Sequence, residues 1–202
     1  MKRLFLSIIA CLLAAVNINA LDAKSVLDKA SANFKKCPSV TIGYTVSNGD
    51  DSDKGTITLQ GQKFCNRMSN MTVWFDGKTM WSYNKDNEEV NVTTPSASQV
   101  ARMNPYAFLS IYRKGYKVAF GKNTNQYYEV ILTAQDAKTS VQKLTVRINR
   151  SNYQPVYVVM TSKKTGNMTI DINSYKKGKR QSDAAYQFSK TKYPNVEIID
   201  LR

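Results

Sequence analysis

Short segments in which apolar and polar residues alternate dominate the chain after residue 70, and no other feature of the sequence constrains the fold as strongly. Successive side chains of a β-strand point to opposite faces of a sheet, so this alternation predicts strands that bury one face. The predicted strands are 71–75, 80–83, 89–92, 116–120, 127–132, 141–148, 156–160, 168–172 and 196–201. Turn signals separate them, which predicts a mainly β fold built on a single large antiparallel sheet.

Two helical stretches accompany the predicted strands. Residues 26–34 carry apolar side chains at the spacing of an amphipathic helix, which should end before Pro38. A second helical stretch is predicted over 96–115, where Asn104-Pro105 supplies a cap and a first helical residue. The chain shows no linker, repeat or low-complexity segment, so residues 21–202 are predicted to form a single α+β domain.

The first twenty residues have the order of a secretory signal peptide. The cationic start Met1-Lys2-Arg3 precedes a short apolar run over 4–16, and a small residue follows at Ala20. The apolar run is too short to span a bilayer, which requires about 20 residues. Residues 1–20 are therefore predicted to be removed on export. The alternative is a lipobox ending at Cys11, which would make the protein itself a lipoprotein, although few apolar residues precede that cysteine.

Two cysteines remain after this cleavage. Residues 40–46 and 55–59 alternate like the two strands of a hairpin, and pairing them across their polar turn places Cys37 opposite Cys65. In an oxidising compartment this arrangement predicts a disulfide. The alternative is a pair of free buried thiols, which a bulge at Gly61 would produce by shifting the register.

The composition argues against an enzyme. The chain contains no histidine, which excludes Ser-His-Asp and Cys-His catalysis and histidine-ligated zinc. It also has no C-x-x-C and no glycine-rich nucleotide-binding motif. We therefore expect no catalytic residues, no metal and no cofactor.

The turn at Asp76-Gly77 sets the expected register in the middle of the sheet. A two-residue turn would pair Phe75 with Lys78, and continuing through the next turn brings Met80 near Val92. One apolar face is then predicted to contain Val73, Phe75, Met80, Val90 and Val92, and the opposite face to carry Trp74, Trp81 and Tyr83. Two explanations remain open: helices or loops cover both faces as plain core, or one face lines a cavity for an apolar ligand.

The same region carries a family resemblance. The chain here reads Val73-Trp74-Phe75-Asp76-Gly77-Lys78-Thr79-Met80-Trp81-Ser82-Tyr83-Asn84, followed by Glu89-Val90-Asn91-Val92. This run resembles the strand–Asp-Gly–strand signature of LolA-like outer-membrane lipoprotein carrier proteins. The order around it is also similar, from the signal peptide and first helix to Asn104-Pro105 and the closing segment 193–200.

The resemblance implies an open, incomplete antiparallel barrel with amphipathic helices packed on its concave side and a cavity for the acyl chains of lipoproteins. It also implies a periplasmic shuttle whose partners are acylated lipoproteins, an inner-membrane lipoprotein-releasing complex and an outer-membrane acceptor. The residues expected to line the cavity are Ile42, Tyr44, Ile57, Leu59, Val73, Phe75, Met80, Val90, Val92, Phe108 and Ile111. An ordinary core role is the alternative for each of them.

One departure from the family concerns the helical lid. In its best-known members an arginine after the second strand latches the lid, whereas the corresponding stretch here, 61–64, has no arginine. Lys63 is the substitute available, but a lysine lacks the planar fork that bonds several carbonyls at once.

The formal net charge of the chain is +14, and much of it lies near the C-terminus. The basic residues concerned are Lys163, Lys164, Lys176, Lys177, Lys179, Arg180, Lys190 and Lys192. Export argues against nucleic acid as the partner, which leaves an anionic membrane surface, an acidic partner or a solvated face. We expect a monomeric carrier; the alternative is a periplasmic lipid-, glycolipid- or protein-binding module on the same fold that transports no lipoprotein.

Overall fold

The computed structural model describes residues 21–104, 106–163 and 166–202, so the predicted signal peptide, the lipobox alternative at Cys11 and Pro105 lie outside it. The helices are α1 (Ala23–Lys35), α2 (Ala97–Met103), α3 (Phe108–Ile111) and the 3-10 helix η1 (Asp183–Tyr186). The strands are β1 (Ser39–Asn48), β2 (Asp51–Gln60), β3 (Lys63–Arg67), β4 (Met71–Phe75), β5 (Met80–Asn84), β6 (Glu89–Thr93), β7 (Tyr116–Phe120), β8 (Tyr127–Ala134), β9 (Val141–Asn149), β10 (Pro155–Ser162), β11 (Gly166–Gly178) and β12 (Glu197–Asp200).

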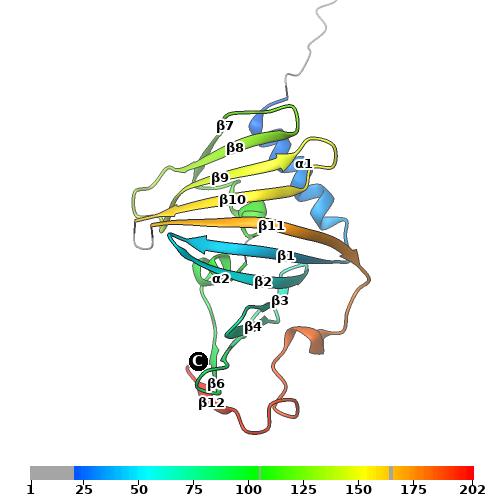
Figure 1. The fold of residues 1–202 in the computed structure, drawn as a ribbon, viewed down its shortest axis with the longest axis vertical. Coiled ribbons are helices and arrows are strands. Elements are labelled where there is room, and N and C mark those ends of the chain that lie inside the picture. Colours follow the sequence, from blue (N-terminus) through cyan, green and yellow to red (C-terminus); the bar gives the residue numbers. More distant parts are fainter. Residues whose placement is uncertain (1–20, 105, 164–165) are drawn as a thin grey trace, which may run out of the picture.

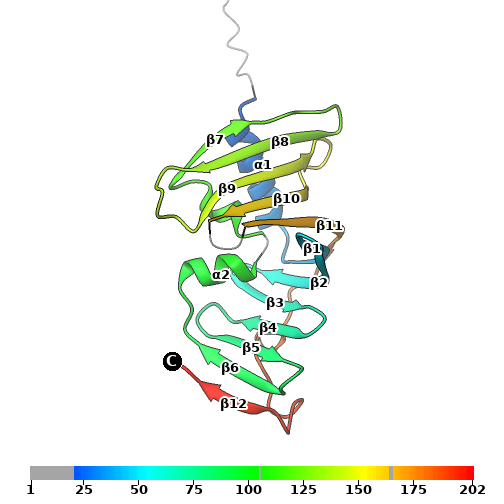
Figure 2. The same cartoon turned by 60° about the vertical axis from the view of Figure 1, so that its left-hand side comes forward.

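The described strands form one 12-stranded sheet in the order β12-β6-β5-β4-β3-β2-β1-β11-β10-β9-β8-β7. Its edge strands β7 and β12 lie at opposite ends of the molecule, so the sheet does not close, and α1 and α2 lie on the same side of it (Figures 1 and 2). Neighbouring strands run antiparallel except β12, which pairs in parallel with β6. This arrangement confirms the predicted mainly β fold with an open, incomplete barrel.

The main hydrophobic core lies between the concave face of the sheet and the helices. Asp22 caps α1 by accepting a hydrogen bond from the backbone N–H of Ser25 at 2.6 Å. The buried side of α1 includes Val26 and Leu27, and full burial of such side chains is worth about 1.5–3 kcal/mol each. They pack in one cluster with Ile42 of β1 and its neighbours, which fixes α1 on this face.

The first hairpin has a shorter turn than the sequence suggested. Asn48 pairs with Asp51 across a two-residue turn in which Gly49 has a φ of 62°, and a second tight turn at Gly61 ends β2. Cys65 therefore belongs to β3, where it pairs with Thr58 and Trp74 on the convex face.

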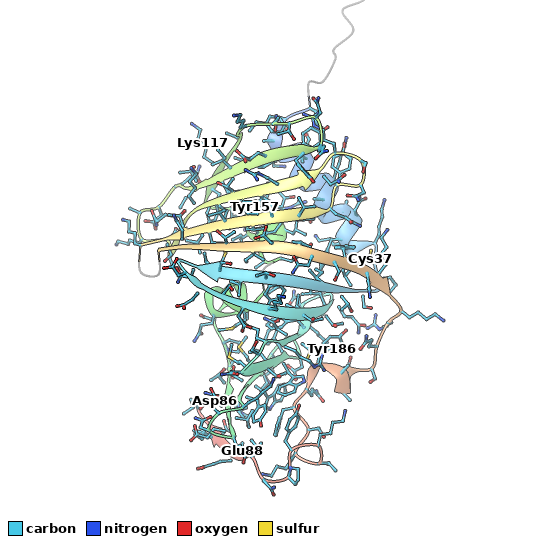
Figure 3. All side chains as sticks on the ribbon, viewed as in Figure 1. Cys37, Asp86, Glu88, Lys117, Tyr157 and Tyr186 are labelled. Carbon is cyan, nitrogen blue, oxygen red and sulfur yellow. The ribbon has the colours of Figure 1, made fainter. Side chains whose placement is uncertain are left out.

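Cys37, in contrast, lies in the connection between α1 and β1. Figure 3 shows Cys37 at one end of the long strands, whereas Tyr186, which packs in one cluster with Cys65, lies farther down the molecule. Both cysteines are free thiols, so the predicted disulfide is wrong. The short turn of the first hairpin explains the error. It shifts the register between the two strands by an odd number of residues, so Cys65 lies on another strand and on the opposite face from the one expected.

The register around β5 also differs from the prediction. Asp76 accepts hydrogen bonds from the backbone of Lys78 and Thr79, at 2.9 and 2.8 Å, and this wider turn pairs Phe75 with Met80. The register differs from the predicted one by an even number of residues, so Phe75 and Met80 still share a face.

The turn between β5 and β6 changes the outcome for two predicted site residues. It includes Glu88 at a φ of 53°, and it pairs Trp81 with Val92 and Tyr83 with Val90. Val90 and Val92 therefore lie on the convex face, and their assignment to the face of Met80 is wrong.

The convex face of β3–β6 is covered by the C-terminal segment that follows β11 (Figure 1). Trp74 makes edge-on contacts with the rings of Phe188 and Tyr193, each at 5.8 Å between ring centroids. Tyr186 and Val196 complete this second apolar cluster. Both faces of this part of the sheet are thus buried, which explains the tryptophans on the face opposite the main core.

A cavity between the sheet and the helices

A cavity with a volume of about 620 Å³ lies between α1, the end of the sheet near the β2–β3 turn, and the α2–α3 region. Its wall is mainly apolar. The lining side chains that carry apolar surface are Phe34, Val40, Leu59, Phe75, Pro95, Ala97, Val100, Tyr106, Ala107, Leu109 and Ile111. Ser31, Lys35, Cys37, Gln62 and Asn104 are the polar or weakly polar ones.

Tyr106 forms part of the wall at the start of the second helical region. The side-chain oxygen of Asn104 accepts a hydrogen bond from the backbone N–H of Tyr106 at 2.9 Å, which holds the turn between α2 and α3. The Tyr106 ring packs against Phe34 of α1 at 5.6 Å between centroids, and its hydroxyl donates to the carbonyl oxygen of Pro155 at 3.4 Å. Burial raises the pKa of Tyr106 well above its usual value, so the phenol stays neutral.

The predicted cavity residues fall into three groups. Leu59, Phe75 and Ile111 line the cavity. A second group shares the apolar cluster between sheet and helices without lining the cavity, namely Ile42, Tyr44, Ile57, Val73, Met80 and Phe108. Val90 and Val92 face the convex side. On β1, β2, β4 and β5 these residues belong to the apolar cluster between sheet and helices, and the cavity occupies one end of this face.

Several lining residues were not among those predicted. Phe34 had been placed on the apolar side of the first helix, and Val100 and Leu109 lie in the predicted second helical stretch. Their helical spacing was the available signal. It could not show how α1 and α2–α3 pack against each other, which decides that these side chains meet around one space.

A polar bridge fixes the end of α2 to the sheet. The Tyr44 hydroxyl donates to Oδ1 of the buried Asn66 at 2.8 Å, and Asn66 Nδ2 donates to the backbone carbonyl of Met103 at 3.3 Å. At its other end, α2 begins with a capping box between Ser96 and Gln99. Asn66 therefore connects β3 to the helix that closes one side of the cavity.

A second set of polar contacts joins α3 and the residues after it to α1. Asp28 of α1 accepts hydrogen bonds from the Tyr112 hydroxyl at 2.6 Å and from Arg113 at 2.9 Å. The hydrogen bond from Tyr112, followed by that from Lys24, lowers the pKa of Asp28. Ser31 also donates to the backbone carbonyl of Leu109 at 3.2 Å. These contacts place α3 over the cavity.

Lys63 does not take part in either set of contacts. Its ammonium group forms an ion pair with Asp183 of η1 at 2.8 Å, on the side of the C-terminal segment. It therefore does not replace the latching arginine of the best-known family members.

Basic side chains surround the end of the sheet at which the cavity lies. Lys35 lines the cavity and Lys36 follows it at the end of α1. On β11, Lys177 pairs directly with Val40 of the cavity wall, and Lys176 pairs with the next residue of β1. This basic rim also includes Lys179, whose backbone carbonyl accepts a hydrogen bond from Ser39 at 2.8 Å.

Within the described ranges, we find no cluster of three or more His, Cys, Asp or Glu side chains arranged to hold a metal. No helix among the described residues has the length and apolar character needed to cross a membrane. The wall of the cavity is mainly apolar, and basic side chains lie beside it.

Several solved structures of other proteins are similar to this one. An uncharacterized conserved protein from Thermus thermophilus superposes with a TM-score of 0.62 at 8% identity, covering 88% of this chain and 98% of that chain. A LolA superfamily protein from Nitrosomonas europaea gives a TM-score of 0.45 at 16% identity, covering 84% and 99%. A putative outer membrane lipoprotein-sorting protein domain from Vibrio parahaemolyticus gives 0.45 at 12% identity, covering 85% and 99%.

The search of curated proteins found no match. A family model described as outer membrane lipoprotein carrier protein LolA matches residues 13–166, which is more than half of the chain. The match includes the stretch around the Asp76-Gly77 turn and extends over α1, α2, α3 and strands β1 to β10. This protein belongs to the LolA family of outer-membrane lipoprotein carrier proteins.

Proposed function

We propose that this protein encloses the acyl chains of lipoproteins in the cavity between its sheet and helices, and carries them through the periplasm from the inner to the outer membrane. The observation that carries the proposal is the apolar cavity of about 620 Å³ whose wall is partly helical. An acyl chain of about sixteen carbons exposed to water costs on the order of 12 kcal/mol, at about 0.8 kcal/mol per methylene. Such cargo requires an enclosed carrier.

The size of the cavity bears on how the cargo enters. A volume of about 620 Å³ is in the range of sites for single small ligands, about 300–1,000 Å³. A lipoprotein with several acyl chains therefore requires α2 and α3 to move away from the sheet. The polar bonds that resist this movement, at Asn66 and Asp28, contribute about 1 kcal/mol each in net terms, which acyl burial readily offsets.

The proposal includes the route and the partners. Residues 1–20 act as a cleaved signal peptide, and residues 21–202 form one periplasmic carrier domain that works as a monomer. The cargo passes from an inner-membrane lipoprotein-releasing complex to an outer-membrane acceptor. The LolA family consists of binding and carrier proteins, so we propose no catalytic step.

The basic rim supports a role in approach to the membrane. Lys35, Lys36, Lys176, Lys177 and Lys179 lie at the end of the sheet where the cavity is found, and all five are exposed. Near an anionic membrane each such charge contributes about 1 kcal/mol of attraction, and salt weakens it. The rim would therefore bring the cavity close to lipid headgroups, and of its lysines Lys35 also lines the cavity.

Purification of the protein from its native envelope, followed by mass spectrometry of bound material, tests the proposal. Co-purified acylated lipoprotein is the expected result. Phospholipid or glycolipid without lipoprotein would contradict transport and favour the alternative of a binding module on the same fold. A Val100→Trp variant, which narrows the cavity, serves as the control because it should retain neither kind of lipid.

A further inference from the structure

A second cavity lies on the opposite face of the sheet from the proposed lipid site. It has a volume of about 210 Å³ and is enclosed between the convex face of β2–β4 and the C-terminal segment. On the sheet side it is lined by Thr58, Cys65, Arg67 and Trp74. On the other side it is lined by residues of the C-terminal segment, namely Gln181, Ala184, Ala185, Tyr186, Gln187, Ser189, Lys192 and Tyr193. It shares no lining residue with the larger cavity.

The segment that closes this cavity is held by specific hydrogen bonds. Gln60 donates from Nε2 to the carbonyl oxygen of Gln181 at 3.1 Å and accepts from the backbone N–H of Gln181 at 2.8 Å. Gln187 donates to Asp76 at 3.5 Å, and the aromatic rings of Phe188 and Tyr193 pack against Trp74. The cavity is therefore built by two fixed walls.

The charged side chains that line the second cavity in the described structure are all positive. Arg67 and Lys192 both line the cavity, and both are exposed, so they lie where it opens to solvent. None of the described lining residues is Asp or Glu. The nearby carboxylate of Asp183 is engaged by Lys63 at 2.8 Å. The opening is therefore positively charged.

One of the described lining residues has a buried hydroxyl group without a hydrogen-bond partner. The Tyr186 side chain is fully buried and lines the cavity, and its hydroxyl has no hydrogen-bond partner within the described structure. Burial, followed by the neighbouring Cys65, raises the pKa of Tyr186, so at neutral pH the phenol keeps its proton and is a donor. An unpaired buried hydroxyl is costly, and buried polar groups are normally satisfied.

We propose that this second cavity binds a small molecule carrying an oxyanion, either a carboxylate or a phosphate, with Arg67 and Lys192 supplying positive charge and the Tyr186 hydroxyl donating a hydrogen bond. Charge-assisted bonds of this kind are the strong ones. Gln187, Ser189 and Thr58 offer further polar groups along the wall. The site is independent of lipid carriage, because it lies on the other face of the sheet.

The test is a titration of the full mature chain with inorganic phosphate, with acetate and with neutral glycerol, each at constant ionic strength set with sodium chloride. Trp74 lines the cavity, so tryptophan fluorescence reports occupancy, and the melting temperature reports stabilisation by a bound ligand. Phosphate or acetate should give a saturable change in both, and glycerol none. A response to phosphate alone identifies a phosphate ligand, and a response to acetate alone a carboxylate.

Two variants test the assigned residues. Tyr186→Phe keeps the buried ring and removes only the hydroxyl, so the protein should fold and bind the responding anion about tenfold more weakly or worse. Arg67→Gln combined with Lys192→Gln should have a similar effect. Tyr83→Phe, in the same aromatic cluster but outside the cavity, and Lys138→Gln, on a distant loop, are matched controls that should bind like the wild type. The proposal is overturned if neither anion gives a saturable response, or if Tyr186→Phe binds with wild-type affinity.

Discussion

Asn66 donates a hydrogen bond from Nδ2 to the backbone carbonyl of Met103 at 3.3 Å, and this bond ties the end of α2 to the middle of the sheet. The same side chain accepts a hydrogen bond from the Tyr44 hydroxyl at 2.8 Å. A neutral amide thus connects the sheet to the end of α2. Because it carries no charge, its strength should depend little on salt.

Replacing Asn66 by Leu should loosen the helix that closes the cavity. The change removes both hydrogen bonds and leaves the Tyr44 hydroxyl and the Met103 carbonyl unpaired, so we expect a loss of about 1–3 kcal/mol in unfolding free energy. Uptake of a fluorescent apolar probe, followed by stopped flow, should become faster. Tyr44→Phe is the control, since it removes only the bond on the sheet side. Equal uptake rates for wild type and Asn66→Leu would show that this bond does not hold the lid.

The contact between α1 and α3 should weaken in acid through Asp28. Hydrogen bonds from Tyr112 and Lys24 lower the pKa of Asp28 in the folded protein below its ordinary value of 3.8. The stability that Asp28 contributes is therefore present above about pH 3.8 and is lost as the pH falls through the lower folded-state pKa. Urea unfolding of wild type and Asp28→Asn should show a wild-type advantage at neutral pH that disappears in strong acid. An advantage that persists unchanged at pH 2 would contradict this role.

The alternation of residues predicted the strands well but not how they join. Strand β4, for example, has the predicted bounds of Met71–Phe75, and Phe75 and Met80 share a face as expected, because the wider turn at Asp76 shifts the register by an even number. Alternation of apolar and polar residues does not show whether the next turn shifts the strand register by an odd number of residues. That is why Val90 and Val92 appeared on the wrong face.

The cavity was predictable only in part for a related reason. The sequence identified Leu59, Phe75 and Ile111 as inward-facing, but Phe34 and Tyr106 meet only because α1 and the α2–α3 turn cross over the same end of the sheet. Such contacts depend on tertiary packing. The packing of the C-terminal segment on the convex face could not be predicted for the same reason, since Tyr186 and Val196 are far from Trp74 in sequence.

The two cysteines should behave as free thiols of different accessibility. Cys65 is buried and burial raises the pKa of its thiol, whereas Cys37 is partly exposed and lines the larger cavity. A thiol reagent should therefore label Cys37 in the native mature protein and Cys65 only after denaturation. An apolar ligand in the cavity should slow labelling of Cys37. Cys37→Ser is the control and should abolish labelling of the native protein. If the denatured, unreduced protein contained no free thiol, the two cysteines would be bridged and this prediction would be contradicted.

The basic rim should act on membrane encounter and not on cargo. Changing Lys176, Lys177 and Lys179 to Glu should weaken binding to vesicles containing anionic phospholipid, by about 1 kcal/mol or more for each change and less at high salt. Binding to neutral vesicles and uptake of an apolar dye should stay unchanged. Co-sedimentation with the two kinds of vesicle measures the effect, and an equal loss of dye uptake would place these lysines in the cargo site.

The most direct test of lipid carriage is the affinity of the mature protein for one lipoprotein in triacylated and unacylated form. The account predicts that only the triacylated form binds, and that Val100→Trp, which fills the cavity from α2, lowers this affinity at least about tenfold while the protein stays folded. Val118→Trp, on β7 and outside the cavity, is the matched control and should bind like the wild type. Equal binding of both lipoprotein forms, or wild-type affinity in Val100→Trp, would contradict the proposal that this cavity holds the acyl chains.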